Sequence, residues 1–300
     1  MHGLARLRQQ SGRYALVDGI PFQLPVRSQG TPALMAAFTV DASKAQALLP
    51  GDELHVLQFG GRAALVVTVV DYLITNIGRY IEFSIALACS HSAVSPGPLL
   101  ALLRRGHYGL GQYVLDLPVS TEVSVKGGKG IWGMPKHQAN LDFTVGKHTV
   151  SSQYDLDGQL AMRIEVSRPL NAWIPLRMAA ANYCEFRGLL MKSYIYFHGR
   201  AGLHVRKPGS ARLFIGAHPR VQALRNLDIS DTPLFALFIP VSGGDLDDYF
   251  ESWFLSYERP PDDAPEGLPS VVNLGQSQAW LPPPSAPYEG PGVLRIGSAG

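Results

Sequence analysis

Two ionisable residues of this chain, Lys136 and Glu82, stand in surroundings that suit amine chemistry. The five residues before Lys136 carry no charge and include Trp132 and Met134. Lysine is rarely buried in proteins, and burial favours its neutral amine, which is the nucleophilic form. Pro135 has a fixed φ and keeps the residue before it extended, so we expect Lys136 to leave a rigid, non-helical turn. The alternative is an ordinary surface lysine after a turn.

Glu82 lies in a segment with strand periodicity, residues 80–90. The odd-numbered positions are apolar, whereas Glu82 shares the other face with Tyr80, Ser84 and Ala86. Small neighbours leave room for a ligand, but a carboxylate on a half-exposed sheet is ordinarily just solvated. Periodicity alone leaves both alternatives open.

Two short runs resemble segments of the acetoacetate decarboxylase family. The run Gly128-Lys-Gly-Ile-Trp-Gly-Met-Pro-Lys136 resembles the family's lysine segment, and Gly78-Arg-Tyr-Ile-Glu82 is similar to its Gly-x-Tyr-x-Glu segment. The resemblance extends from about residue 33 to residue 255. It implies that Lys136 forms a Schiff base with a keto acid, which is a well-known example of an activated lysine, and that Glu82 acts beside it.

Four further residues are candidates for substrate contacts. Tyr80 belongs to the glutamate segment, and Trp132 and Met134 precede the lysine, so we expect Tyr80 to line a pocket and Trp132 and Met134 to form either the pocket wall or part of the core. Arg27 lies in the region of the family's carboxylate-binding arginine, although the alignment needs a gap there. An ordinary surface arginine is the alternative for Arg27.

The chain departs from the decarboxylase pattern at three places. His137 stands where the decarboxylases carry a second lysine, Gly130 where they carry a glutamate, and residues 63–70 lack an acid where another active-site glutamate would fall. Adjacent side chains of an extended segment point to opposite sides, so His137 is expected to face away from the Lys136 amine. The missing acids favour a substrate other than acetoacetate.

Composition restricts the partners and cofactors. The chain has 300 residues, 46% of them hydrophobic, and a formal net charge of +2 with scattered basic residues, which argues against a nucleic-acid partner. The most apolar run, residues 63–70, is too short to span a membrane. Cys89 and Cys184 fit buried thiols in a reducing compartment, so we expect a cytoplasmic location. The histidines show no metal-ligand spacing, and neither a metal nor a cofactor is expected.

Short segments with strand character, spaced about ten residues apart and with few helices between them, predict a β-dominated protein. A Gly-Gly pair at 60–61 predicts a hairpin of residues 53–59 with residues 62–75. Residues 245–255 have a helix-like pattern. The family resemblance implies a closed, antiparallel, cone-like β-barrel with a few flanking helices, assembled into homo-oligomers.

The chain divides by composition into two parts. We expect a single barrel domain over residues 1–257 and a tail rich in proline and glycine over residues 258–300. Because the tail has little apolar periodicity, its removal is expected to leave the fold intact.

Two functions remain open from the sequence. The first is a Schiff-base-forming lyase that acts through Lys136 on a keto acid. It would decarboxylate a β-keto acid such as acetoacetate, or carry out a related aldol or dehydration reaction. The second is a non-catalytic barrel that binds a small apolar carboxylic ligand, with Lys136 as a salt-bridge partner.

Overall fold

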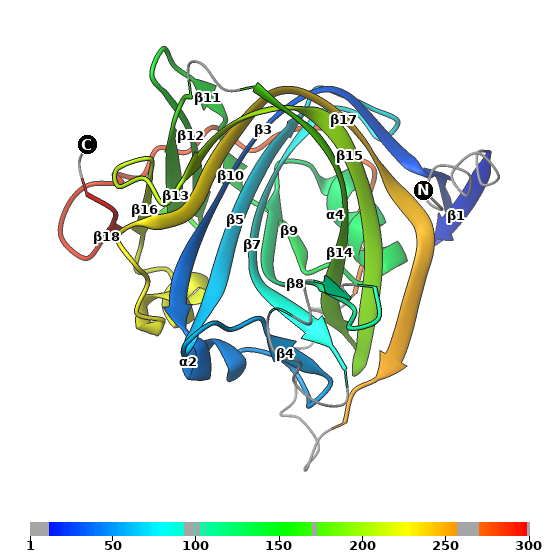
Figure 1. Ribbon diagram of the computed structural model, residues 1–300. Helices are drawn as coiled ribbons and strands as arrows, with labels where there is room; N and C mark the ends of the chain where they lie inside the picture. The colour runs from blue at the N-terminus through cyan, green and yellow to red at the C-terminus, as the bar shows by residue number, and fades with distance from the viewer. Residues whose placement is uncertain are drawn as a thin grey trace.

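The computed structural model describes residues 12–92, 99, 103–104, 106–169, 173–256 and 270–298. Figure 1 shows a ring of long, curved strands with a smaller sheet beside it. Few helices accompany the strands in the described ranges. The predicted β-dominated fold class is therefore confirmed.

Seven strands form the barrel, and each pairs with the next around a closed ring. In ring order they are β7 (Tyr80–His91), β5 (Arg62–Tyr72), β3 (Val26–Asp41), β17 (Pro233–Phe254), β15 (Leu189–Val205), β14 (Trp173–Phe186) and β8 (Gly111–Val119). The pairing of β8 with β7 closes the ring. β14 runs parallel to β8, and the other neighbours in the ring are antiparallel. The predicted closed barrel is present, and its sheet is mixed.

The remaining elements cover the barrel or extend its edges. β4 (Leu54–Val56), β6 (Ile74–Thr75) and β9 (Lys136–Gln138) join the barrel sheet, and β1 (Arg13–Val17) forms a hairpin with β2 (Ile20–Leu24). A second sheet contains β10 (Asn140–Leu141), β11 (Thr144–Val145), β12 (Thr149–Leu156), β13 (Gln159–Ser167), β16 (Ala211–Ile215) and β18 (Leu294–Ile296). The helices with described bounds are α2 (Ala42–Gln46), α4 (Glu122–Trp132) and the 3-10 helix η1 (Pro219–Asn226).

The main hydrophobic core joins the second sheet to one face of the barrel wall. Alternate residues of β3, β5 and β7 point into it, as the period of two in their apolar residues requires. The Phe83 ring of β7 lies 5.9 Å from the Tyr154 ring of β12, centroid to centroid. The opposite face of β7, which carries Glu82, does not contribute to this core.

Helix α4 connects two parallel strands, β8 and β9, because a parallel pair needs a crossover. The helix ends at Gly133, which has the left-handed φ of 66° typical of a glycine C-cap. In Figure 1, α4 and β9 are seen through the ring of barrel strands. The expected non-helical turn before Lys136 is present at residues 133–135, and the helix that precedes it was not predicted.

Two other local predictions hold only in part or not at all. The predicted turn at Gly60-Gly61 is present, because Phe59 and Arg62 form an isolated antiparallel bridge with reciprocal backbone hydrogen bonds. The hairpin does not extend into β4 and β5, because both pair antiparallel with β7, β4 at residues 89–91 and β5 at residues 80–87, and so run in the same direction. Residues 245–255 are not helical. They continue β17 as far as Phe254, because β15 supplies a long partner edge from Leu189 onward.

The C-terminal region lies against the rest of the protein in its described part, residues 270–298. β18 pairs antiparallel with β16, and further contacts reach α4 and β7. The expected boundary between a barrel domain (1–257) and a tail (258–300) lies outside the described residues and stays a prediction. Among the helices that the structure describes, none has the length and apolarity to cross a membrane.

Candidate functional site

The Lys136 side chain is buried between β9, β7 and helix α4. Its exposed fraction is 3%. The ammonium nitrogen Nζ lies 2.7 Å from Glu82 Oε2 and donates a hydrogen bond to Ser124 Oγ at 3.0 Å. A lysine and a glutamate taken from water at such a site are costly to desolvate unless they pair. The structure therefore joins the two residues that the sequence singled out, and it adds Ser124.

The strand register explains why these two residues meet. Glu82 pairs with Val119 across the β7–β8 ladder, and Lys136 pairs with Leu117 across the β8–β9 ladder. Leu117 and Val119 are two residues apart on β8, so their side chains lie on one face. Lys136 and Glu82 consequently project to the same side from β9 and β7, the two strands that flank this part of β8.

Two tyrosines complete the surroundings of the pair. The Lys136 nitrogen lies 5.3 Å from the centre of the Tyr80 ring, and the Tyr72 hydroxyl lies 3.5 Å from Glu82 Oε1. The two rings stack at 4.6 Å. Burial, and after it the Glu82 charge, raise the pKa of both tyrosines well above the ordinary value. Both hydroxyls thus stay protonated and can donate hydrogen bonds at neutral pH.

Cys184 is close enough to the pair to be influenced by both charges. Burial raises the pKa of its thiol to about 12, and the Lys136 and Glu82 charges act on it in opposite directions. A thiol with this pKa is protonated at neutral pH and is a poor nucleophile. Lys136 is therefore the better candidate nucleophile of the two.

Glycine at position 128 of α4 makes room for the lysine. A Cβ atom there would lie 2.5 Å from Lys136 Cδ, closer than non-bonded carbon atoms approach. Glycine is a poor helix former, so the helix propensities of the glycines in α4 do not predict this helix. Their presence is explained by close contacts, since a Cβ at Gly127 would meet Phe22 and one at Gly130 would meet Val17.

Trp132 and Met134 belong to an apolar cluster at the C-terminal end of α4. They are almost fully buried and pack with Val26 and Leu117. The Trp132 indole Nε1 donates a hydrogen bond to the Asp247 carbonyl at 3.1 Å. This contact ties the end of α4 to β17 and so supports the turn that carries Lys136. A direct contact of either residue with a substrate stays a prediction.

The structure does not bring Arg27 to this group. Its neighbour Val26 packs with Met134, so the adjacent Arg27 side chain points to the other face of β3. There Arg27 is 57% exposed and its Nε lies 3.5 Å from Asp245 Oδ1. It borders a separate cavity of about 550 Å³, together with His198 and a glycine-rich stretch of β17. A substrate-binding role for Arg27 has no support from this geometry.

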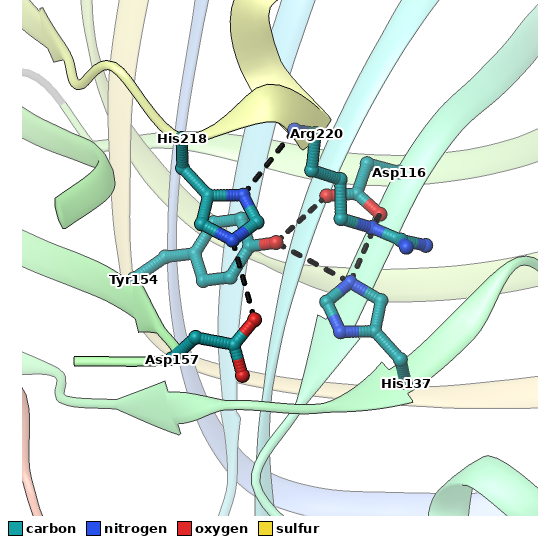
Figure 2. A network of polar contacts seen from close by, with 6 residues as sticks. All are labelled: Asp116, His137, Tyr154, Asp157, His218 and Arg220. Atoms are coloured by element: carbon teal, nitrogen blue, oxygen red, sulfur yellow. Dashed lines mark hydrogen bonds and ion pairs between the residues drawn. The ribbon is translucent and has the colours of Figure 1, made fainter. Parts of the chain in front are cut away.

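His137 belongs to a different network on the opposite face of β9, as its position next to Lys136 predicts. Its Nε2 lies 3.0 Å from Asp116 Oδ1, which also accepts a hydrogen bond from Arg220 Nε at 2.7 Å. Figure 2 shows these groups converging with the Tyr154 hydroxyl, which donates to Asp116 Oδ2 at 3.1 Å. Burial alone raises the pKa of the Asp116 carboxyl, but His137 and Arg220 hold it below its ordinary value.

Sequence reasoning missed Ser124 and Tyr72. Ser124 lies in α4, whose glycines argue against a helix. Tyr72 reaches the site only because it pairs with Tyr80 across the β5–β7 ladder. The alternation of side chains along β5 and β7 was the signal in the sequence that could have placed Tyr72 beside Tyr80. In the described part of the chain, no group of three or more His, Cys, Asp or Glu side chains is arranged to hold a metal ion.

The fold and the lysine site agree with the family to which the chain belongs. The family model described as acetoacetate decarboxylase (ADC) matches residues 11–174, more than half of the chain, and the chain is a member of that family. It thus belongs to a family of enzymes, and the resemblance inferred from the two short runs is confirmed.

Solved structures share this fold at low sequence identity. Acetoacetate decarboxylase from Legionella pneumophila subsp. pneumophila str. Philadelphia 1 has a TM-score of 0.54 and 16% identity, covering 78% of this chain and 91% of that one. The enduracididine biosynthesis enzyme MppR, solved in complex with pyruvate, has a TM-score of 0.54 and 16% identity, covering 77% of this chain and 91% of its own. No curated protein sequence matches the chain.

Proposed function

We propose that the protein is an enzyme that forms a Schiff base between Lys136 and a keto acid. One observation carries the proposal: a lysine only 3% exposed meets one carboxylate, Glu82, and one hydroxyl, Ser124. The carboxylate can take a proton from the ammonium group, and the hydroxyl can hold the amine in place. An ordinary surface lysine has neither the burial nor these partners.

The proposed reaction starts with a proton transfer from Lys136 Nζ to Glu82 Oε2. The neutral amine then attacks the ketone carbon, and one of the two protons on its nitrogen passes to the carbonyl oxygen, which becomes the hydroxyl of a carbinolamine. Protonated Glu82 returns its proton to that hydroxyl, which leaves as water and gives the iminium. General acid–base catalysis of this kind typically contributes about 10²–10⁴-fold in rate. The tyrosine hydroxyls, which stay protonated, can donate hydrogen bonds to the substrate oxygens.

The iminium is an electron sink that two further steps can use. In a β-keto acid, the bond to the carboxylate breaks, its electron pair moves towards the iminium nitrogen, and carbon dioxide leaves. In an α-keto acid, a proton leaves the carbon next to the iminium and the resulting enamine attacks an aldehyde. The similar structures include an acetoacetate decarboxylase and the enzyme MppR in complex with the condensation product of pyruvate and imidazole 4-carboxaldehyde, which supports considering both branches.

A non-catalytic binding protein is the second candidate, and the closeness of the ion pair favours it. At 2.7 Å, Glu82 stabilises the ammonium form of Lys136. If the proton never leaves, Lys136 acts only as a cation that binds the ligand's carboxylate. This alternative predicts binding without a covalent adduct.

Trapping with borohydride separates the two candidates. The protein is incubated with a panel of α- and β-keto acids and borohydride, and the adduct is located by intact mass and peptide mapping. We expect one reduced ligand on Lys136, none in Lys136→Arg, and normal labelling in the control Lys147→Arg, an exposed lysine in the turn after β11. Binding by calorimetry with no adduct at Lys136 would establish the binding protein instead. Release of carbon dioxide during turnover distinguishes decarboxylation from the aldol branch.

A further inference from the structure

A segment near the C-terminus lies against the first turn of helix α4 and the start of β7. We call residues 271–282 the C-terminal strap. We infer that this strap is part of the Lys136 site and that Lys126 is the positioning residue that fastens it to α4. The inference rests on the proposed function of Lys136, because it concerns the groups that hold that amine.

Lys126 is fully buried, and its ammonium group is used entirely to hold neighbouring segments. Nζ donates to Asp18 Oδ2 at 2.9 Å, to the Val271 carbonyl at 3.0 Å and to the Leu274 carbonyl at 2.7 Å. A lysine ammonium has three N–H donors, so all three are satisfied. Two of them end on the strap and the third on the turn between β1 and β2.

The strap also caps the N-terminus of α4. The first amides of a helix have no partner within it, and the N-cap residue Thr121 makes no side-chain cap hydrogen bond. Instead, Val123 N donates to the Ser277 carbonyl at 3.1 Å, and the Glu122 carboxylate accepts from Gly275 N at 2.9 Å. The first turn of α4 therefore depends on the strap, and Ser124, which holds the Lys136 amine, lies in that turn.

A second set of contacts supports the tyrosine side of the site. Leu274 packs against the cluster that contains Tyr72 and Tyr80. Trp280 donates through its Nε1 to the Arg79 carbonyl at 3.2 Å, one residue before Tyr80, and forms an isolated β-bridge with Thr121. The strap thus touches the two elements that carry Ser124 and Tyr80. Ser124 and Tyr80 both lie at the lysine amine. By holding the elements that carry them, the strap fixes the positions of both residues relative to that amine.

The first test measures what Lys126→Met does to Lys136. The rate of borohydride trapping is followed as a function of keto-acid concentration in the wild type, in Lys126→Met and in the control Lys147→Met. We expect the limiting rate to fall about tenfold or more in Lys126→Met, because a small displacement of a group at the reacting centre is enough for such a loss. The half-saturating concentration should change little, and the control should match the wild type.

A double-mutant cycle tells positioning from a general loss of stability. If Lys126 acts by holding Ser124, then Ser124→Ala slows trapping in the wild type but adds little in the Lys126→Met background. Independent, multiplicative effects of the two substitutions would overturn the inference. If Lys126→Met does not fold, Trp280→Ala takes its place in the same cycle, since it removes the two side-chain contacts of the strap with Arg79 and no buried charge.

Hydrogen exchange separates failure of this inference from failure of the proposed function. In Lys126→Met and in Trp280→Ala, the amides of residues 122–126 should exchange at least about tenfold faster than in the wild type, while those of β12 should not change. This readout needs no substrate. If no keto acid labels wild-type Lys136, the proposed function is wrong. If exchange in α4 is unaffected by both substitutions, the positioning role is wrong whatever the labelling shows.

Discussion

Lys126 and Lys136 are both almost inaccessible to solvent, yet their nitrogen atoms meet different partners. Lys126 donates to two backbone carbonyls and one carboxylate, which fills all three of its donor positions. Lys136 has one carboxylate and one hydroxyl in hydrogen-bonding contact and the face of Tyr80 at 5.3 Å. Burial alone therefore does not distinguish the lysine that we propose as the nucleophile. The difference lies in whether a carboxylate can take the proton while a direction of attack stays open.

The largest difference is expected when each lysine is replaced by methionine. Lys136→Met should abolish the borohydride adduct, because the amine itself is lost. Lys126→Met should retain the adduct at a reduced rate but lower the free energy of unfolding by about 3 kcal/mol, since it leaves two carbonyls of the strap, and the solvent-exposed Asp18 carboxylate, without their donor. Denaturant unfolding and peptide mapping on both variants check this. Complete loss of the adduct in a folded Lys126→Met protein would contradict the division of roles.

The carboxylate partners should differ in the same way. Glu82→Gln keeps the shape of the side chain but cannot accept the proton, so we expect trapping at Lys136 to slow by at least about 10²-fold with little change in melting temperature. Asp18→Asn, the matching change beside Lys126, should leave the trapping rate within a few-fold of the wild type. Near-normal trapping in Glu82→Gln would show that the glutamate is only a structural partner of the lysine.

Two glycines of α4 allow a smaller and more local comparison. A Cβ at Gly128 would lie 2.5 Å from Lys136 Cδ, whereas a Cβ at Gly130 would lie 2.4 Å from a Val17 methyl group. Gly128→Ala should therefore slow trapping about tenfold by displacing the amine. Gly130→Ala should loosen the β1–β2 hairpin and leave trapping close to normal. Equal trapping rates in the two variants would show that Gly128 does not define the position of the lysine.

The smallest effect is expected on the other face of β9 and depends on pH. The pKa of Asp116 is lowered in the folded protein, so its carboxylate contributes stability above its unfolded pKa, and this contribution is lost as pH falls through the lower folded value. Wild-type stability should thus decline below about pH 4 more steeply than that of Asp116→Asn. At neutral pH, the rate of borohydride trapping at Lys136 in Asp116→Asn should be close to that of the wild type. Parallel acid-unfolding curves would contradict the expected linkage.

Local patterns and the family resemblance together identified the main residues of the site. The alternation of residues 80–90 placed Glu82 on the face with Tyr80 and the apolar approach drew attention to Lys136, but only the resemblance favoured a functional role over a solvated one. Regularly spaced strands predicted a β-dominated fold. These inferences succeed because strand alternation and the conformation around a proline depend on neighbours along the chain.

What local patterns could not supply were the contacts between distant segments. The glycines of α4 look unfavourable for a helix until Gly128 is seen to make room for Lys136, and residues 245–255 look helical until β15 offers them a partner strand. The C-terminal strap looks dispensable by composition, yet its carbonyls bind Lys126.

The sequence by itself determined the class of fold, the lysine and its glutamate. Only the tertiary structure decided that Ser124 holds the amine, that Arg27 points away from it, and that the strap lies over α4. The physical reason is that hydrogen-bond partners and close contacts are set by distances in space. Residues such as Lys126 and Leu274, 148 positions apart, have no signal in common along the chain.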